Sequence, residues 1–267
     1  MTKPLLDFAS RSDQGKVRAR NEDSVVVHPD AGVVVIADGM GGASCGDVAS
    51  RMAINVIGQH FLRHVPSRIR PNRARRLAQT AVNAANAAIL EHARRTAGCT
   101  GMGTTVVVGY FGNSWLTYAH VGDSRLYRLR ERALVQLTSD HSLIQESVDQ
   151  GYFVDLSEAR HYGINEHVLT RAVGSKVHAT ATIAVTDLAP GDIYLFCTDG
   201  LTGMVPDEKL RLVLSVVEEN LGSAADALVK LACANGGVDN ITIALVRVNA
   251  LGDDAEEAER SDAAIDG

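Results

Sequence analysis

Hydrophobic positions along the chain follow two periods, which predict strands in some stretches and helices in others. Short runs rich in Val and Ile, alternating or continuous, are typical of half-buried and buried strands. They lie at 24–28, 32–37, 104–111, 115–121, 125–130, 133–137, 179–185, 192–197 and 240–248. Apolar residues at helical spacing predict helices at 47–64, 72–96, 142–150, 207–220 and 223–234. The stretch from 151 to 167 has neither period and is predicted to be irregular.

The order of these elements bears on the fold class. The strands follow one another and the helices come in pairs, whereas a parallel sheet needs strands and helices in regular alternation. The pattern therefore predicts an α+β fold in which two antiparallel sheets pack together with helix pairs outside them.

Size and charge divide the chain into a body and a tail. With 267 residues, 46% of them apolar, it can bury the core of one large domain, which we place at 1–249. Residues 250–267 hold seven acids and one Arg, so they carry the whole formal net charge of −6. Few of them are large and apolar, and we expect this tail to be disordered. The acid-free, arginine-rich stretch 63–76 is predicted to be a solvated connection between helices, because Pro66 and Pro71 interrupt it.

The sequence shows no pattern typical of a membrane span, a secretory signal or a disulfide framework. No apolar run approaches the roughly 18 residues that span a bilayer, and Met1–Ser12 lacks the apolar core of a secretory signal. The four cysteines (Cys45, Cys99, Cys197 and Cys233) are far apart and form no CxxC pair. This spacing favours free thiols in a reducing cytoplasm and supports neither a zinc site nor a disulfide framework.

Candidate chemistry lies in four acidic segments: 18–23 (Arg-Ala-Arg-Asn-Glu-Asp), 38–42 (Asp-Gly-Met-Gly-Gly), 198–200 (Thr-Asp-Gly) and 238–240 (Val-Asp-Asn). Three of them adjoin predicted buried strands, where an uncompensated acid is costly. Any one of them taken singly is most simply a turn. Together, converging acids would repel one another unless hard divalent cations compensated them, so the four segments predict a magnesium or manganese site.

Eight ordered segments between about residues 12 and 248 carry a family resemblance. They are the segments at 18–23 and 38–42, then 102–105 (Met-Gly-Thr-Thr), 121–125 (Val-Gly-Asp-Ser-Arg), 138–142 (Thr-Ser-Asp-His-Ser), 169–174 (Leu-Thr-Arg-Ala-Val-Gly), 198–201 (Thr-Asp-Gly-Leu) and 239–242 (Asp-Asn-Ile-Thr). The chain resembles the metal-dependent serine/threonine protein phosphatases of type 2C, in their bacterial branch. The resemblance implies a four-layer αββα sandwich and hydrolysis of phosphoserine and phosphothreonine by a metal-activated water.

The same resemblance implies roles for the acids. Asp38 would bridge two Mn²⁺ or Mg²⁺ ions, and the carbonyl of Gly39 would bind one of them. Asp199 and Asp239 would be the remaining ligands of the other ion, while Glu22 would hold the second ion, directly or through water.

Four further residues receive implied roles. Asp23 and Asn240 would support the ligands from behind, and Asp123 would bind a possible third ion together with Asp199. Arg18 would bind the phosphoryl group, for which a planar guanidinium is well shaped.

No histidine is assigned as a general acid. Some family members have a histidine directly after the Asp-Gly pair, but here that residue is Met40. His141 is interpreted as part of a structural hydrogen-bonding cluster. His161 falls in 151–167, which matches the flap beside the site in bacterial relatives.

The implied partners are phosphorylated proteins, including a bacterial-type serine/threonine kinase or its substrates; we expect a monomer that binds neither nucleic acid nor membrane. Two other functions stay open. A pseudophosphatase would bind phosphoproteins without turnover, although the complete acid set argues against it. A calcium sensor would need an EF-hand loop, and no such loop is present.

Overall fold

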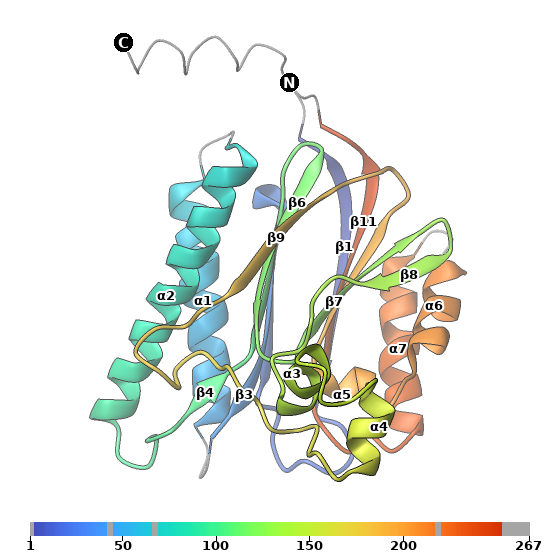
Figure 1. Ribbon diagram of the computed structural model, residues 1–267. Helices are drawn as coiled ribbons and strands as arrows, with labels where there is room; N and C mark the ends of the chain where they lie inside the picture. The colour runs from blue at the N-terminus through green and yellow to red at the C-terminus, as the bar shows by residue number, and fades with distance from the viewer. Residues whose placement is uncertain (1–2, 42–44, 66–68, 217–219, 253–267) are drawn as a thin grey trace.

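Two antiparallel sheets packed face to face, each covered on its outer side by helices, build the protein (Figure 1). The computed structural model describes residues 3–41, 45–65, 69–216 and 220–252. This architecture confirms the predicted α+β sandwich of four layers.

The first sheet has the strand order β2-β3-β5-β6-β9, with the short β4 paired to β3. Its strands are β2 (Asp23–His28), β3 (Val33–Met40), β4 (Gly103–Thr104), β5 (Val106–Phe111), β6 (Trp115–Val121) and β9 (Thr182–Asp187). The long helices α1 (Gly46–His64) and α2 (Pro71–Arg95) cover its outer face (Figure 1).

The second sheet has the strand order β1-β11-β10-β7-β8. Its strands are β1 (Leu5–Asp13), β7 (Arg125–Arg130), β8 (Ala133–Gln136), β10 (Ile193–Cys197) and β11 (Ile241–Ala250). Helices α6 (Asp207–Ser215) and α7 (Leu221–Ala234) cover it, and α3 (Leu143–Asp149), α4 (Leu156–His161) and α5 (Asp199–Thr202) lie near one end of the sandwich (Figure 1).

Alternation along the strands fills three apolar layers. On β3, Val33 and Val35 face the α1–α2 pair, while Val34 and Ile36 face the other sheet. Because successive side chains of a strand point to opposite faces, a strand buried on both sides is apolar throughout. This is why the sequence at 32–37 lacks polar residues.

The predicted strands and helices are all present, with ends shifted by a few residues. Strand β1 was not predicted, because it is an edge strand whose Arg11, Ser12 and Asp13 break the apolar pattern, and the short helices α4 and α5 were not predicted either. Helix α6 ends at Ser215, before the predicted end at 220.

The prediction that the cysteines are unpaired is wrong for two of them. Cys45 and Cys99 form a disulfide, with their Cα atoms 5.4 Å apart, whereas Cys197 and Cys233 are free. The spacing hid the pair because the bond joins the start of α1 to the loop after α2, which are 54 residues apart. Because two of the four cysteines are paired, the cysteines no longer favour a reducing cytoplasm.

Two other expectations concern the connections and the tail. Helix α1 ends at His64 and α2 begins at Pro71, so the arginine-rich stretch does connect two helices, although residues 66–68 lie outside the described part. Strand β11 continues to Ala250, and the Gly252 amide donates to the Asn113 carbonyl. The body therefore ends slightly later than 249, and the tail beyond 252 lies outside the described residues. None of the described helices has the length and apolar character to cross a membrane.

Candidate metal centre

The predicted site residues gather at one end of the sandwich, where strands of both sheets finish. Asp23 opens β2 and is paired in register with Asp38 on β3. Asp199 opens α5 directly after β10, and Asp239 stands just before β11. The two sheets thus bring together acids from opposite ends of the sequence, Asp23 and Asp239 among them.

The backbone of Asp38 is fixed by Thr104 on β4 and by the next residue, Thr105. Its amide donates to Oγ1 of Thr105 over 3.0 Å, and its carbonyl accepts from Oγ1 of Thr104 over 2.8 Å. Burial, followed by the charges of Asp23 and Asp199, raises the pKa of the Asp38 carboxyl well above its ordinary value. A buried carboxyl group with a raised pKa is stabilised by binding a proton or by a cation close to it.

Gly39 is required by close packing. A Cβ there would collide with the Gly46 carbonyl oxygen at the start of α1 and would lie 2.7 Å from the Glu22 carbonyl oxygen. The Gly39 amide also donates to that Glu22 carbonyl over 3.1 Å. Glycine therefore lets three chain segments meet beside Asp38.

Asn240 holds the segment that carries Glu22. Its Oδ1 accepts from the Glu22 amide, and its Nδ2 donates to the carbonyls of Gln14 and Arg20, each over 2.8 Å. Burial and then the charge of Asp47 raise the pKa of Glu22. Asn240 thus has the supporting position expected from the sequence.

Asp23 is buried behind this segment. Burial raises its pKa to about 7, and its Oδ2 accepts from the hydroxyl of Thr198 over 2.8 Å. Its Oδ1 is buried and has no hydrogen-bond partner. Such an orphaned carboxylate oxygen is costly, and a cation or a bound water would satisfy it.

Asp199 and Asp239 are close to Asp38 and to each other. Burial, then the charge of Asp239, raises the pKa of Asp199, and a side-chain hydrogen bond with Asp38 opposes this only in part. Oδ1 of Asp199 is also buried without a partner. Asp239 accepts 2.6 Å from Nη2 of Arg18, which therefore reaches the acid cluster.

Asp123 occupies the turn between β6 and β7. Burial, then the charges of Asp199 and Asp140, raise its pKa to about 7. The preceding Gly122 has φ +104°, and a Cβ there would lie 2.6 Å from Cγ2 of Thr105. The turn is therefore glycine-dependent and packed against the strand segment that also holds Asp38.

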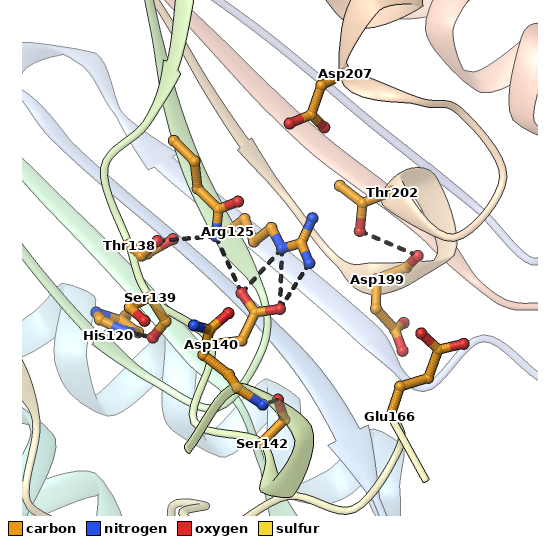
Figure 2. A network of polar contacts seen from close by, with 12 residues as sticks. His120, Arg125, Thr138, Ser139, Asp140, Ser142, Glu166, Asp199, Thr202 and Asp207 are labelled. Carbon is orange, nitrogen blue, oxygen red and sulfur yellow. Dashed lines mark hydrogen bonds and ion pairs between the residues drawn. The ribbon is translucent and has the colours of Figure 1, made fainter. Parts of the chain in front are cut away.

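An ion pair that the sequence analysis left without a role supports this turn. Arg125 donates through Nε and Nη2 to both oxygens of Asp140, the shortest of these bonds being 2.7 Å (Figure 2). Nη1 of Arg125 donates to the hydroxyl of Tyr127, which in turn donates to Asp207. The motifs at 121–125 and 138–142 contained this pair, but sequence spacing alone does not show that the two residues meet.

A polar pocket of about 280 Å³ opens beside Asp123 and Asp199. The segment predicted to be irregular lines one side of it with Arg160, Glu166 and His167, and Figure 2 shows Glu166 reaching toward Asp199. His161 is exposed on α4 and is not among the residues that line the pocket. The flap therefore lies beside the acids, but the histidine singled out from the sequence does not.

The donor set fits hard divalent cations. Its atoms are carboxylate and carbonyl oxygens, which Mg²⁺ and Mn²⁺ prefer, and the buried oxygens of Asp23, Asp47 and Asp199 have no partner. Within the described ranges, no three acidic, histidine or cysteine side chains already form a closed metal cage. Their oxygens are instead engaged by Arg18, by Thr198 and by one another.

An αββα sandwich with acids converging at one end of its two sheets defines the class of metal-dependent protein phosphatases. Comparison with known proteins agrees: residues 14–232 match the family model described as protein phosphatase 2C. The chain belongs to the protein phosphatase 2C family.

Its relatives include bacterial serine/threonine phosphatases. The chain is 35% identical to the serine/threonine protein phosphatase PstP of Mycobacterium tuberculosis over 91% of this chain and 45% of that protein. It therefore spans about half the length of PstP. It is 33% identical to the serine/threonine phosphatase stp of Listeria innocua, over 90% of this chain and 95% of the other. The catalytic domain of PstP, solved in complex with two manganese ions, superposes with a TM-score of 0.79 and 34% identity, covering 91% of this chain and 97% of that domain.

Proposed function

We propose that this chain is a metal-dependent phosphatase that hydrolyses phosphoserine and phosphothreonine in proteins. The observation that carries the proposal is the convergence of Asp38, Asp199 and Asp239 with Arg18 at their edge. The buried acids Asp38 and Asp199, whose pKa values are raised, need cations, and a guanidinium beside them suits a phosphate. The family and its similarity to PstP support the same activity.

The proposed ligands follow from where the oxygens lie. Asp38 feels the charges of Asp23, Asp199, Asp123 and Asp239 and is the candidate for bridging two ions, one of which the Gly39 carbonyl and Glu22 would also bind. Asp199 and Asp239 would bind the other ion, and the charge of Asp199 acts on Asp123, so a third ion would find two carboxylates there. When bound, divalent ions lower the pKa of a water and neutralise phosphoryl oxygens.

The protein's own groups have complementary tasks. Arg18 would bind the phosphoryl oxygens and orient the phosphorus toward the acids. Asp23, held by Thr198, and Asn240, which holds the Glu22 amide, keep the ligand segments in place. The pocket lined by the flap would accept the residues that flank the phosphorylated side chain.

The choice of metal and partners is part of the proposal. The relative with two manganese ions favours Mn²⁺, and Mg²⁺ prefers the same ligands. Phosphorylated proteins, including a kinase or its substrates, are the proposed partners of a monomeric enzyme. A cytoplasmic location stays a prediction from the sequence.

The test is hydrolysis of a phosphothreonine peptide by the purified chain, with Mn²⁺, Mg²⁺, Ca²⁺ or a chelator. We expect turnover with Mn²⁺ or Mg²⁺, none with the chelator, and little with Ca²⁺. Asp199→Asn is the matched inactive control. Absence of turnover at saturating Mn²⁺, with the peptide still bound, would instead favour a pseudophosphatase. Binding of Ca²⁺ in preference to Mn²⁺ would favour a sensor.

A further inference from the structure

A buried histidine pair lies next to the turn that carries Asp123. The rings of His120 and His141 stack with their centroids 4.4 Å apart and their planes 15° apart. Nε2 of His120 donates to the Ser139 carbonyl over 2.8 Å (Figure 2). His141 is buried and comes from the loop between β8 and α3.

His141 holds the Gly122 residue from two directions. Its ring Nδ1 accepts from the Gly122 amide over 3.1 Å, and its own amide donates to the Gly122 carbonyl over 3.0 Å. Gly122 immediately precedes Asp123, so the ring fixes the peptide between Val121 and Gly122 and the backbone amide of His141 fixes the peptide between Gly122 and Asp123. The His141 carbonyl also accepts from the Thr170 amide, which anchors His141 to the segment at 169–174.

The hydrogen bonds also define the state of the ring. An amide can donate only to an unprotonated nitrogen, so Nδ1 bears no proton and Nε2 carries it. Nε2 lies 2.9 Å from Oγ1 of Thr182, which can accept that proton's hydrogen bond, and 3.3 Å from Nη1 of Arg171, which cannot accept it. Burial, then the nearby His120 and Arg171, lower the pKa of His141 to about 3, which agrees with a neutral ring.

The other side of the same turn is tied to Asp38. Oγ1 of Thr105 accepts from the Asp38 amide over 3.0 Å and lies 2.7 Å from Oγ of Ser124. Either hydroxyl can donate to the other, because the Thr105 oxygen keeps a second lone pair and its own proton after accepting from the Asp38 amide. The turn at 122–124 is thus held between Thr105, on the Asp38 side, and His141.

We propose that His141 is a positioning residue for Asp123: its neutral ring holds the Gly122 peptide and so keeps the Asp123 carboxylate beside Asp199. This inference rests on the proposed function, in which Asp123 and Asp199 share a metal ion. It gives His141 a task other than proton transfer.

Two substitutions separate the two nitrogens of the ring. The Oδ1 of Asn falls close to the place of Nδ1, so His141→Asn keeps an acceptor for the Gly122 amide and loses the contact with Thr182. The amide of Gln falls close to the place of Nε2, so His141→Gln keeps the contact with Thr182 and loses the acceptor. If His141 only filled space, the two variants would bind Mn²⁺ equally well.

The experiment is a Mn²⁺ titration of each folded variant, with free Mn²⁺ followed by electron paramagnetic resonance. We expect His141→Asn to bind within about threefold of the wild type, and His141→Gln to weaken one class of site by about tenfold to a hundredfold, as loss of a supporting partner does elsewhere. In Asp123→Asn the same class of site should be weakened, and adding His141→Gln should then change little.

Equal behaviour of the Asn and Gln variants, or additive effects in the double variant, would overturn the proposal. Should His141→Gln fail to fold by circular dichroism, a folded His141→Asn variant decides alone, because loss of that site would contradict the role and its retention would support it. Wild-type protein that binds no Mn²⁺ would instead count against the proposed function itself.

Discussion

Nη2 of Arg18 donates a 2.6 Å hydrogen bond to Oδ2 of Asp239, which joins two segments 221 residues apart in the chain. The charges of Asp239, Asp38 and Asp199 all raise the pKa of Arg18. The side chain of Arg18 is 55% exposed, so its guanidinium lies at the solvent edge of the acid cluster, where a phosphate would enter.

Arg18→Ala should therefore raise the KM for a phosphothreonine peptide by about tenfold or more, since a charge-assisted hydrogen bond contributes about 1.5–3 kcal/mol. Mn²⁺ affinity should change by less than about threefold, because exposed ion pairs contribute little. Steady-state kinetics and calorimetry measure the two effects. Arg20→Ala, two residues away and exposed, is the control that should leave KM unchanged. Equal KM values for the two variants would remove Arg18 from the substrate site.

The disulfide between Cys45 and Cys99 should stabilise the fold. Closing a loop of this length contributes about 4 kcal/mol in the chain-entropy model. We expect the Cys45→Ser, Cys99→Ser double variant to lose roughly that free energy of unfolding in urea, while Cys233→Ser, a free and partly exposed thiol, loses little. Thiol counting of the native chain should find two free cysteines. A count of four in air-oxidised protein would contradict the bond.

In the metal-free protein, the free energy of unfolding should depend on pH because the Asp123 carboxyl titrates. Its ordinary pKa is near 3.8, and in the folded protein burial raises it to about 7. A raised carboxyl pKa stabilises the fold fully below about pH 4, and this contribution is lost as pH rises through 7. In chelator, the stability of Asp123→Asn relative to the wild type should therefore increase between pH 4 and 8. Denaturant unfolding at several pH values measures it, and a difference that stays constant with pH would refute the burial argument.

Removing the tail after Gly252 should leave the fold intact. The cut preserves β11 to Ala250 and the hydrogen bond from Gly252 to Asn113, so the described packing loses nothing. The formal net charge changes from −6 to 0, because the removed residues hold seven acids and Arg260. The melting temperature should stay within about 1 °C of the full chain, as proteins tolerate loss of unpacked ends. A fall of several degrees would show that the tail packs on the domain.

The sequence predicted the layers well because their cause is local. Val33 to Ala37 is apolar on both faces and can only be a buried strand, and the helix pairs show their period directly. The sequence was a poorer guide to contacts between residues that are far apart along the chain. No sequence feature near Cys45 indicates that it pairs with Cys99. Arg125 contacts Asp140 because β7 pairs with β8, which brings the loop after β8 next to β7.

The same contrast between local patterns and long-range contacts holds for the candidate site. Family motifs assigned the acids, and the fold brings them together, but the motif did not reveal that Arg18 contacts Asp239 or that His141 holds Gly122. The irregular pattern of 151–167 also did not show where His161 lies, and the structure leaves it exposed on α4 and outside the lining of the pocket. These contacts depend on packing between segments that the sequence separates.

The proposed metal centre can be seen directly in an anomalous-diffraction map of crystals of this chain grown with Mn²⁺. We predict two manganese peaks, both bound by the Asp38 carboxylate, one also by Asp199 and Asp239 and the other by the Gly39 carbonyl and Glu22. The same map from Asp38→Asn crystals should lose at least one peak. Manganese bound away from Asp38, or absent at saturating concentration, would show that Asp38 does not bridge two ions.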